Sequence, residues 1–501
     1  MAYLIAPRIF KMTRPSAFKI APLPPKDSQR TPYYLQLYQR FRDAMAEGQL
    51  KPGERVPSVR SLASELNLAR GTVDKAYQML IGEGYLWPRG PAGTIVSPHL
   101  SSPPHHSRSY TSSPQQTVAP TSQQNVTVSR PDHLQPGLPA LDAFPRKTWT
   151  RLMSRQLRAQ TRADMAYPAA TGYPPLKQAI ASYLSVSRGI HCQPEQVFIT
   201  AGYRGALRLI THALCLAGTT AWFEEPGYRY ARICLAQAGL HLVPVPVDKE
   251  GLNLAEGLKR APNARVAVVT PSHQSPLGMS LSLPRRQALL AWAEAQSGWI
   301  IEDDYDSEFR YHGAPLPALK SLDQAERVLY TGTFSKVLLP GLQLAYLVVP
   351  LNQVDRFTQY AQHLPGPGMT LPQATIATFM TQGGFARHLR RMRTLYAQRR
   401  EVLTTALEQD LGHILSVQHQ PGGIHLLTYL KPYHGATTVN PPGLDQQMAT
   451  VARQRGIGIE PLSPWYLGQP DRQGFIMGFT NVEDSTMAQQ HLSPLRDILN
   501  R

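Results

Sequence analysis

The 501-residue chain has few cysteines and lacks any long apolar run. Its three cysteines, Cys192, Cys215 and Cys234, are odd in number, widely spaced and set among apolar neighbours. We therefore expect core thiols in a reducing compartment, with neither a disulfide framework nor a metal site. No run of about 18 apolar residues occurs, which argues against a membrane span. The first residues lack an apolar core and a small-residue cleavage site, so the sequence predicts a cytoplasmic protein rather than a secreted one.

Acidic residues are scarce relative to basic ones. The chain holds 34 Asp and Glu against 51 Lys and Arg, and its formal net charge is +17. Large basic proteins often bind a polyanion, nucleic acid first of all, although a basic surface can also simply keep a protein soluble. The apolar fraction of 42% suits a globular protein. The length allows two or three domains, each with its own core.

Hydrophobic periodicity is missing between residues 98 and 136, where Ser, Pro, Gln, His and Thr dominate. Such a composition cannot bury enough apolar surface to offset the entropy of ordering, so this stretch is predicted to be a flexible linker. It would separate a small domain at 30–97 from a large domain at 137–501. Residues 1–29 are interpreted as an N-terminal extension without a predicted fold.

Residues 30–97 show helices followed by a hairpin. Ser58 is a good N-cap for a helix with apolar residues on one face. A second helix follows a tight turn, and "YLWPRGPAGTIVS" indicates two short strands around a Pro/Gly turn. This order is typical of a winged helix-turn-helix, whose second helix enters the major groove of DNA while the hairpin tip meets the backbone. A small interaction domain with a solvated basic face is the alternative.

The residues that could contact DNA lie off the apolar faces: Ser58, Arg60, Arg70, Thr72, Lys75, Arg89 and Gly90. The stretch "LKPGERVPSVRSLASELNLARGTVDKAYQMLIGEGYL" resembles the GntR-type winged-helix domain over its whole length. The resemblance assigns DNA contacts to Arg60, Arg70, Thr72 and Gly90. The family often has Ser or Thr where Ala69 stands and a second basic residue near Asp74, so the base readout can differ here.

Residues 137–501 alternate helical stretches with short β-rich runs, which predicts an α/β domain with a mainly parallel sheet. Ligand sites of such sheets lie at the carboxyl ends of the strands. Four strand ends carry unusual polar residues: "ITAGYRGALRLI" offers free helix amides to an anion, "EEPGYRY" offers Tyr228, "IIEDDYDSEF" offers a carboxylate pair and Tyr305, and "TGTFSK" offers Thr333, Ser335 and Lys336. A phosphate cradle, an aromatic, a carboxylate, a phenol and a lysine together are what pyridoxal 5′-phosphate requires.

The same stretches resemble the fold-type I aminotransferases, and most closely the MocR subfamily, in which such a domain is fused to a GntR domain. The matching stretches include "EEPGY", "TPSHQSPLGMSLSLPRRQALL", "IEDDYDSEFRY" and "GTFSKVLLPGLQLAY". The resemblance implies that Lys336 is the Schiff-base lysine, Asp303 the partner of the pyridine nitrogen, Tyr305 the donor to the ring O3′ and Tyr228 the stacking aromatic. It places Gly202, Tyr203, Arg204, Thr333 and Ser335 on the phosphate side.

The resemblance departs at three positions. Gln343 stands where the family has a phosphate-binding arginine, Ala345 where it has a glycine, and Ile476 where many relatives have an arginine that grips a substrate carboxylate. We expect a homodimeric transcriptional regulator that binds operator DNA and senses an amine, an amino acid or a vitamin B6 vitamer. An active aminotransferase that carries a DNA-binding domain is the main alternative. A vestigial pocket in a domain that only dimerises is the third.

Overall fold

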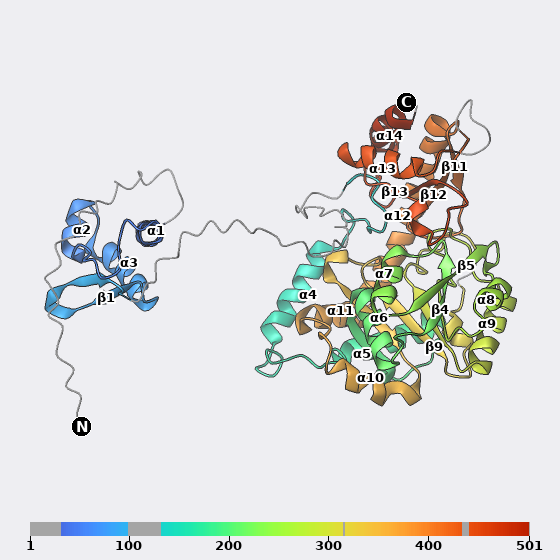
Figure 1. The fold of residues 1–501 in the computed structure, drawn as a ribbon, viewed down its shortest axis with the longest axis horizontal. Helices are drawn as coiled ribbons and strands as arrows, with labels where there is room; N and C mark the ends of the chain where they lie inside the picture. The colour runs from blue at the N-terminus through green and yellow to red at the C-terminus, as the bar shows by residue number, and fades with distance from the viewer. Residues whose placement is uncertain (1–31, 99–131, 314–315, 433–439, 500–501) are drawn as a thin grey trace, which may run out of the picture. The chain divides into compact units, whose positions relative to one another are not determined.

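The computed structural model describes residues 32–98, 132–313, 316–432 and 440–499. The described residues form two compact units, one within 32–98 and one from 132 onward (Figure 1). The predicted extension at 1–29 and most of the predicted linker lie outside the described residues.

The end of the predicted linker differs from the structure, because residues 132–136 belong to the large unit. Leu134 is buried, and its carbonyl accepts a hydrogen bond from Gly478 N at 2.7 Å. The neighbouring His133 pairs with Gly456 and Gly458 through its backbone N–H and C=O, at 2.9 and 2.7 Å. These contacts are made by the main chain and one apolar side chain, so composition gave no sign of them.

The first unit has the predicted order of helices and hairpin. Its elements are α1 (Tyr33–Ala46), α2 (Val59–Glu65), α3 (Arg70–Gly82), β1 (Leu86–Pro88) and β2 (Thr94–Val96), with a 3₁₀ turn at Gly90–Ala92 between the strands. β1 and β2 pair antiparallel. The apolar stripe of α3 forms the middle of the core, since Val73, Ala76, Tyr77 and Leu80 are all buried. Ser58 caps α2 as predicted, because its Oγ accepts a hydrogen bond from Ser61 N at 3.1 Å.

The large unit is built on an eight-stranded sheet of order β3-β10-β9-β8-β7-β4-β5-β6. The strands are β3 (Val197–Ala201), β4 (Thr220–Glu225), β5 (His241–Asp248), β6 (Gly251–Leu252), β7 (Val266–Val269), β8 (Trp299–Asp304), β9 (Val328–Thr333) and β10 (Leu344–Val348). β4, β5, β7, β8 and β9 pair in parallel. β10 runs antiparallel to both of its neighbours, so β3 points the same way as β9. The prediction of a mainly parallel sheet is confirmed.

Helices cover both faces of this sheet (Figure 1). Their bounds are α4 (Arg146–Ala159), α5 (Pro174–Arg188), α6 (Gly202–Ala213), α7 (Arg229–Gln237), α8 (Leu254–Arg260), α9 (Leu283–Ala295), α10 (Val354–Ala361), α11 (Thr370–Thr381) and α12 (Gly384–Leu411). Alternating strand residues supply the two cores: Val197 and Ile199 of β3 pack in the cluster that includes α5, and Phe198 packs in the cluster that includes α6. Both faces are therefore buried, as a parallel sheet requires.

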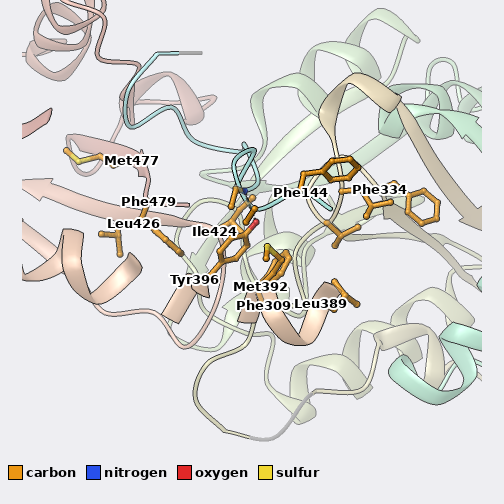
Figure 2. Packing of buried hydrophobic residues seen from close by; sticks show 14 of the residues in the cluster. Phe144, Phe309, Phe334, Leu389, Met392, Tyr396, Ile424, Leu426, Met477 and Phe479 are labelled. Atoms are coloured by element: carbon orange, nitrogen blue, oxygen red, sulfur yellow. Dashed lines mark hydrogen bonds between the residues drawn. The ribbon is translucent and has the colours of Figure 1, made fainter. Parts of the chain in front are cut away.

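A second, antiparallel sheet follows, which the sequence analysis did not predict. It has the order β11-β12-β14-β13, with β11 (Leu415–Gln418), β12 (His425–Leu430), β13 (Glu460–Pro461) and β14 (Gly474–Gly478), and it is accompanied by α13 (Leu444–Gln454) and α14 (Ser485–Leu499). Figure 2 shows how Tyr396 and Met392 of the long α12 lie with Phe309, while Leu426, Met477 and Phe479 come from the side of the small sheet. One continuous core therefore joins the two sheets.

Candidate functional site

The residues predicted to contact DNA lie on the outside of the first unit. Arg60, Arg70 and Arg89 are exposed, and Thr72 is half-buried on α3. Lys75 is exposed as well, and its Nζ lies 3.9 Å from the centroid of the Tyr34 ring of α1. This contact holds the ammonium group of Lys75 over the ring by a cation–π interaction.

The hairpin tip has a further basic side chain that the sequence analysis missed. Gly90 has a φ of +58° and opens the turn between the strands. At Gly93, a Cβ atom would lie 2.8 Å from Nε of Arg55, so the absence of a side chain there makes room for the guanidinium. Arg55 is exposed beside the hairpin. Its place could not be read from the sequence, because it precedes the hairpin by many residues.

In the large unit, a cavity of about 440 Å³ opens where the strands end. It is lined by all nine residues that were predicted to form the site: Gly202, Tyr203, Arg204, Tyr228, Asp303, Tyr305, Thr333, Ser335 and Lys336. They follow or end β3, β4, β8 and β9, which point the same way, so their carboxyl ends meet at one edge of the sheet. The structure thus brings together residues that lie more than a hundred positions apart in the chain.

Lys336 reaches into this cavity from the turn after β9. Its Nζ donates a hydrogen bond to the carbonyl oxygen of Gly137 at 2.9 Å. Burial lowers the pKa of Lys336, and the carboxylates of Asp306, Glu460 and Asp303 oppose that shift. A lowered pKa increases the fraction of neutral amine, which is the nucleophilic form. Gly137 has a φ of +78°, and a Cβ atom there would lie 2.5 Å from Nζ.

The two adjacent aspartates at the end of β8 have different surroundings. Asp304 forms a buried ion pair with Arg188 at 2.8 Å and accepts a hydrogen bond from the Tyr330 hydroxyl at 2.6 Å. Asp303 points the other way, as alternation along a strand requires, and lines the cavity. Burial raises the pKa of Asp303 to about 8. Within the described ranges Asp303 has no ion-pair partner, so a cation in the cavity would stabilise its charged form.

Tyr305 is held by a chain of buried polar groups. Its hydroxyl lies 3.0 Å from Nδ1 of His273, which also lies 3.1 Å from the Asp306 carboxylate. Nε2 of His273 lies 3.2 Å from Oε1 of Gln420. The Gln420 amide nitrogen donates to the carbonyl oxygens of Pro276 and Leu277, so its oxygen must face the imidazole. His273 therefore carries a proton on Nε2, and the chain fixes the position of the Tyr305 hydroxyl.

An aromatic wall lies on another side of the cavity. The Tyr228 ring centroid is 6.3 Å from that of Tyr203 and 5.8 Å from that of Trp465. Tyr230 stands 5.6 Å from Tyr228 in an edge-to-face arrangement. These rings offer a planar ligand stacking surfaces of low flexibility.

The turn between β3 and α6 offers an anion site. Gly202 has a φ of +69°, which a residue with a side chain rarely adopts, and it directly begins α6. Gly202, Tyr203 and Arg204 of this helix start line the cavity together with Gln343, and the first amides of a helix have no partner within it and can bind an anion. In the turn after β9, which also lines the cavity, the hydroxyl of Thr333 accepts a hydrogen bond from Ser335 N at 3.1 Å.

Several residues of the cavity were missed at the level of sequence. They are Gln135, Pro136, Gly137, Ser275, Ile424, His425, Glu460 and Trp465. Most come from the segment before α4 or from the small antiparallel sheet, neither of which ends a strand of the large sheet. Burial lowers the pKa of His425 to about 4, and its Nε2 donates to the carbonyl of Pro276 at 3.1 Å, so this imidazole is neutral. In the ranges that the structure describes, no cluster of three or more metal-ligating side chains occurs.

Comparison with known proteins supports the division into two units. Residues 33–96 match the family model "Bacterial regulatory proteins, gntR family", and residues 140–475 match "Aminotransferase class I and II". No helix among the described residues has both the length and the apolarity needed to cross a membrane.

Named regulators align with this chain over most of both lengths. The chain is 36% identical to the "Probable rhizopine catabolism regulatory protein MocR" of Rhizobium meliloti, over 91% of this chain and 92% of that protein. It is 33% identical to the "HTH-type pyridoxine biosynthesis transcriptional regulator PdxR" of Corynebacterium glutamicum, over 90% and 93%. Among solved structures, LysN, an α-aminoadipate aminotransferase from Thermus thermophilus complexed with N-(5′-phosphopyridoxyl)-L-leucine, matches 74% of this chain and 92% of its own, with a TM-score of 0.65 and 25% identity. The chain belongs to the MocR subfamily of GntR-type transcriptional regulators, which join a winged helix-turn-helix to an aminotransferase-like domain.

Proposed function

We propose that this regulator binds pyridoxal 5′-phosphate in the cavity of its large unit and that the occupant of the cavity controls binding to operator DNA. The observation that carries the proposal is the convergence of Lys336, Asp303 and Tyr305 on one cavity with an anion-binding turn beside it. When bound, the cofactor supplies an electrophilic carbonyl carbon and an electron-withdrawing ring.

Each side chain has a role that its surroundings support. The half-buried amine of Lys336 is the group that bonds covalently to the cofactor, since burial favours its neutral form. Asp303 holds the ring nitrogen, because a buried carboxylate without an ion pair gains most from a protonated nitrogen beside it. Tyr305 would hydrogen-bond the ring oxygen from a position that His273 fixes.

The remaining predicted residues would hold the ring and the phosphate. Tyr228 stacks on the ring. The phosphate would be held by the hydroxyls of Thr333 and Ser335, by the amides at Gly202 and Tyr203 and by the Arg204 side chain. The cavity residues therefore fit the cofactor, although Gln343 offers only a neutral amide on the phosphate side.

The first unit supplies the second half of the function. Ser58, Arg60, Arg70, Thr72, Lys75, Arg89 and Gly90 form the surface that would meet double-stranded DNA. α3 would enter the major groove and the hairpin would meet the backbone. We infer that the large unit forms a homodimer, which would present two such surfaces to paired half-sites.

An active aminotransferase is a second candidate, favoured by one observation: the lysine, the aspartate and the tyrosine that act on the ring all line the cavity. Incubation of the full-length protein with an amine pool and an oxo-acid acceptor separates the two functions. Sustained turnover would establish an enzyme, and a single binding event without turnover would establish a sensor.

The cofactor assignment is tested with Lys336→Ala in the full-length chain. The variant should lose the visible absorbance of the cofactor–lysine linkage and the adduct that borohydride traps. Lys259→Ala, an exposed lysine of α8 with only surface partners, is the matched control and should keep both. A trapped adduct in the Lys336 variant would mean that another lysine carries the linkage.

A further inference from the structure

The cavity contains a carboxylate that the proposed function does not use. Glu460 begins β13 of the small antiparallel sheet and lines the same cavity as Lys336. Glu460 is half-buried, and burial raises its pKa. Within the described part of the chain, its side chain has no hydrogen-bond or ion-pair partner. The ionised form of a partly buried carboxylate without a partner costs free energy, and a nearby cation would offset that cost.

The other charges around the cavity leave this end without a positive partner. Among the described lining residues the charged side chains are Arg204, Asp303, Lys336 and Glu460. Arg204 belongs to the first turn of α6, which begins at Gly202. Two other arginines, Arg229 and Arg453, act on Glu460 from outside, but neither lines the cavity. Arg229 instead lies over the Tyr230 ring, 5.1 Å from its centroid.

Lys336 cannot serve as the lasting partner of Glu460 if the proposed function is correct. Its ammonium group stabilises the Glu460 carboxylate only while the lysine is free. A lysine bonded to the cofactor no longer offers that free ammonium. The loaded cavity therefore presents Glu460 as an unpaired negative charge.

The surroundings of Glu460 also disfavour a ligand carboxylate. Glu460 pairs in register with Ile476 of β14, and Ile476 is buried in an apolar cluster with Trp465 and Leu462. His425 of β12 also lines the cavity, and burial lowers its pKa to about 4, so it adds no positive charge. A carboxylate placed here would meet a like charge and apolar side chains, and neither Arg229 nor Arg453 lines the cavity to receive it. A cation would meet a carboxylate and the faces of Tyr228 and Trp465.

We propose that Glu460 selects the effector, and that the effector is a primary amine with a second cationic group at its far end and no carboxylate, such as a diamine. The inference rests on the proposed cofactor function: the first amine would displace Lys336 from the cofactor's carbonyl carbon and release the lysine as a neutral amine, the form that burial favours, while the second amine pairs with Glu460. A partly buried charge-assisted pair gives both affinity and orientation.

The test uses full-length protein loaded with pyridoxal 5′-phosphate and three probes that share a primary amine: 1,4-diaminobutane, butylamine and 4-aminobutyrate. Binding is measured by calorimetry and by the change in the cofactor's visible absorbance. The diamine should bind about tenfold to a hundredfold tighter than butylamine, which is the effect of a hydrogen-bonded charge partner. The aminobutyrate should bind more weakly than butylamine, because like charges repel.

Variants separate recognition from folding. Glu460→Gln keeps the size of the side chain and should reduce the preference for the diamine to near unity, with the cofactor spectrum retained. Glu460→Asp keeps the charge and should keep the preference. Glu294→Gln, an exposed glutamate of α9, is the matched control and should behave as the parent.

Two results would overturn this inference and leave the proposed function standing. One is binding of aminobutyrate at least as tight as that of the diamine, and the other is an unchanged preference for the diamine in Glu460→Gln. A loaded protein that ignores all three amines would also reject it while leaving cofactor binding in place. Failure to load the cofactor at all would instead overturn the proposed function, so the two failures are distinguishable.

Discussion

The two units of the molecule present their functional side chains in opposite ways. In the first unit, the arginines that we propose to contact DNA, Arg60, Arg70 and Arg89, are exposed and lie within about 30 residues of chain. In the large unit, Lys336 is half-buried and Asp303 is buried, and the two come from separate strand ends. A solvated charge can meet a polyanion without reorganising its surroundings, whereas a buried charge must be matched by a particular partner. Exposed arginines suit an extended polyanion, and the cavity side chains suit a small ligand whose charged groups match their positions.

The largest expected effect distinguishes two neighbouring carboxylates of the buried site. Asp304→Asn should cost about 3–5 kcal/mol of unfolding free energy, because it leaves the buried Arg188 guanidinium uncompensated. Asp303→Asn should change stability little but weaken cofactor binding. Denaturant unfolding and cofactor titration of both variants measure this. Equal losses of stability would mean that Asp303 is a structural residue too.

The second largest effect is expected in the pH dependence of stability, to which the buried Glu224 of the large unit contributes. Burial raises the pKa of Glu224 to about 7, and its oxygens accept hydrogen bonds from Thr270 and Gln274. Between the pKa of the unfolded chain and about pH 7, the folded state holds a proton on Glu224 that the unfolded state has lost. The contribution of Glu224 to the free energy of unfolding is therefore complete below the unfolded pKa, and it falls by up to about 3 kcal/mol as the pH rises to about 7.

Glu224→Gln should remove that decline. Urea unfolding at about pH 4 and about pH 8 measures how much the free energy of unfolding changes with pH in the parent and in the variant. The exposed Glu294→Gln serves as control and should leave the slope unchanged. A parent and variant with identical pH profiles would show that Glu224 is ionised in the folded protein.

On the exposed surface, the expected effect is smaller. Arg70 is the first residue of α3, and Arg70→Ala should weaken specific DNA binding by about 1–3 kcal/mol if the guanidinium reads a base edge. A phosphate contact would instead reduce affinity for all sequences. Gel shifts at fixed salt distinguish these outcomes, with the exposed Arg496→Ala of α14 as control. Unchanged operator binding would remove Arg70 from the interface.

The smallest effect concerns Arg204, the exposed side chain that also lines the cavity. If its charge replaces the one that Gln343 does not supply, Arg204→Gln should lower cofactor affinity about tenfold, since charge-assisted bonds are roughly twice as strong as neutral ones. Adding Gln343→Arg should restore the affinity. Cofactor titration of the single and double variants decides, and an unaffected single variant would leave the phosphate to the helix amides and hydroxyls.

The comparison also explains what the sequence could predict. Strand ends followed by Gly, Tyr, Asp or Lys are local signals, and all nine cavity residues predicted from them lie together. Glu460 and His425 belong to short strands of the small sheet, and no local sequence pattern indicates that these residues line the cavity. Gln135 was assigned to the linker and Gly137 to the first position of the large domain, and the contacts that place this segment, main-chain bonds of His133 and Leu134 and the bond of Gly137 to Lys336, join residues far apart in the chain. Long-range pairing of this kind has no signature in composition or periodicity.

The hydrogen bond from Lys336 to the carbonyl oxygen of Gly137 has a consequence for how a signal leaves the cavity. Its acceptor belongs to the segment 132–138, the first described part of the large unit on the side of the chain that leads back to the DNA-reading unit. An amine that becomes bonded to carbon has fewer hydrogens to donate, so this contact depends on what Lys336 is bonded to. The bonding state of this one nitrogen atom therefore decides whether the main chain at the start of the large unit keeps the hydrogen bond at Gly137.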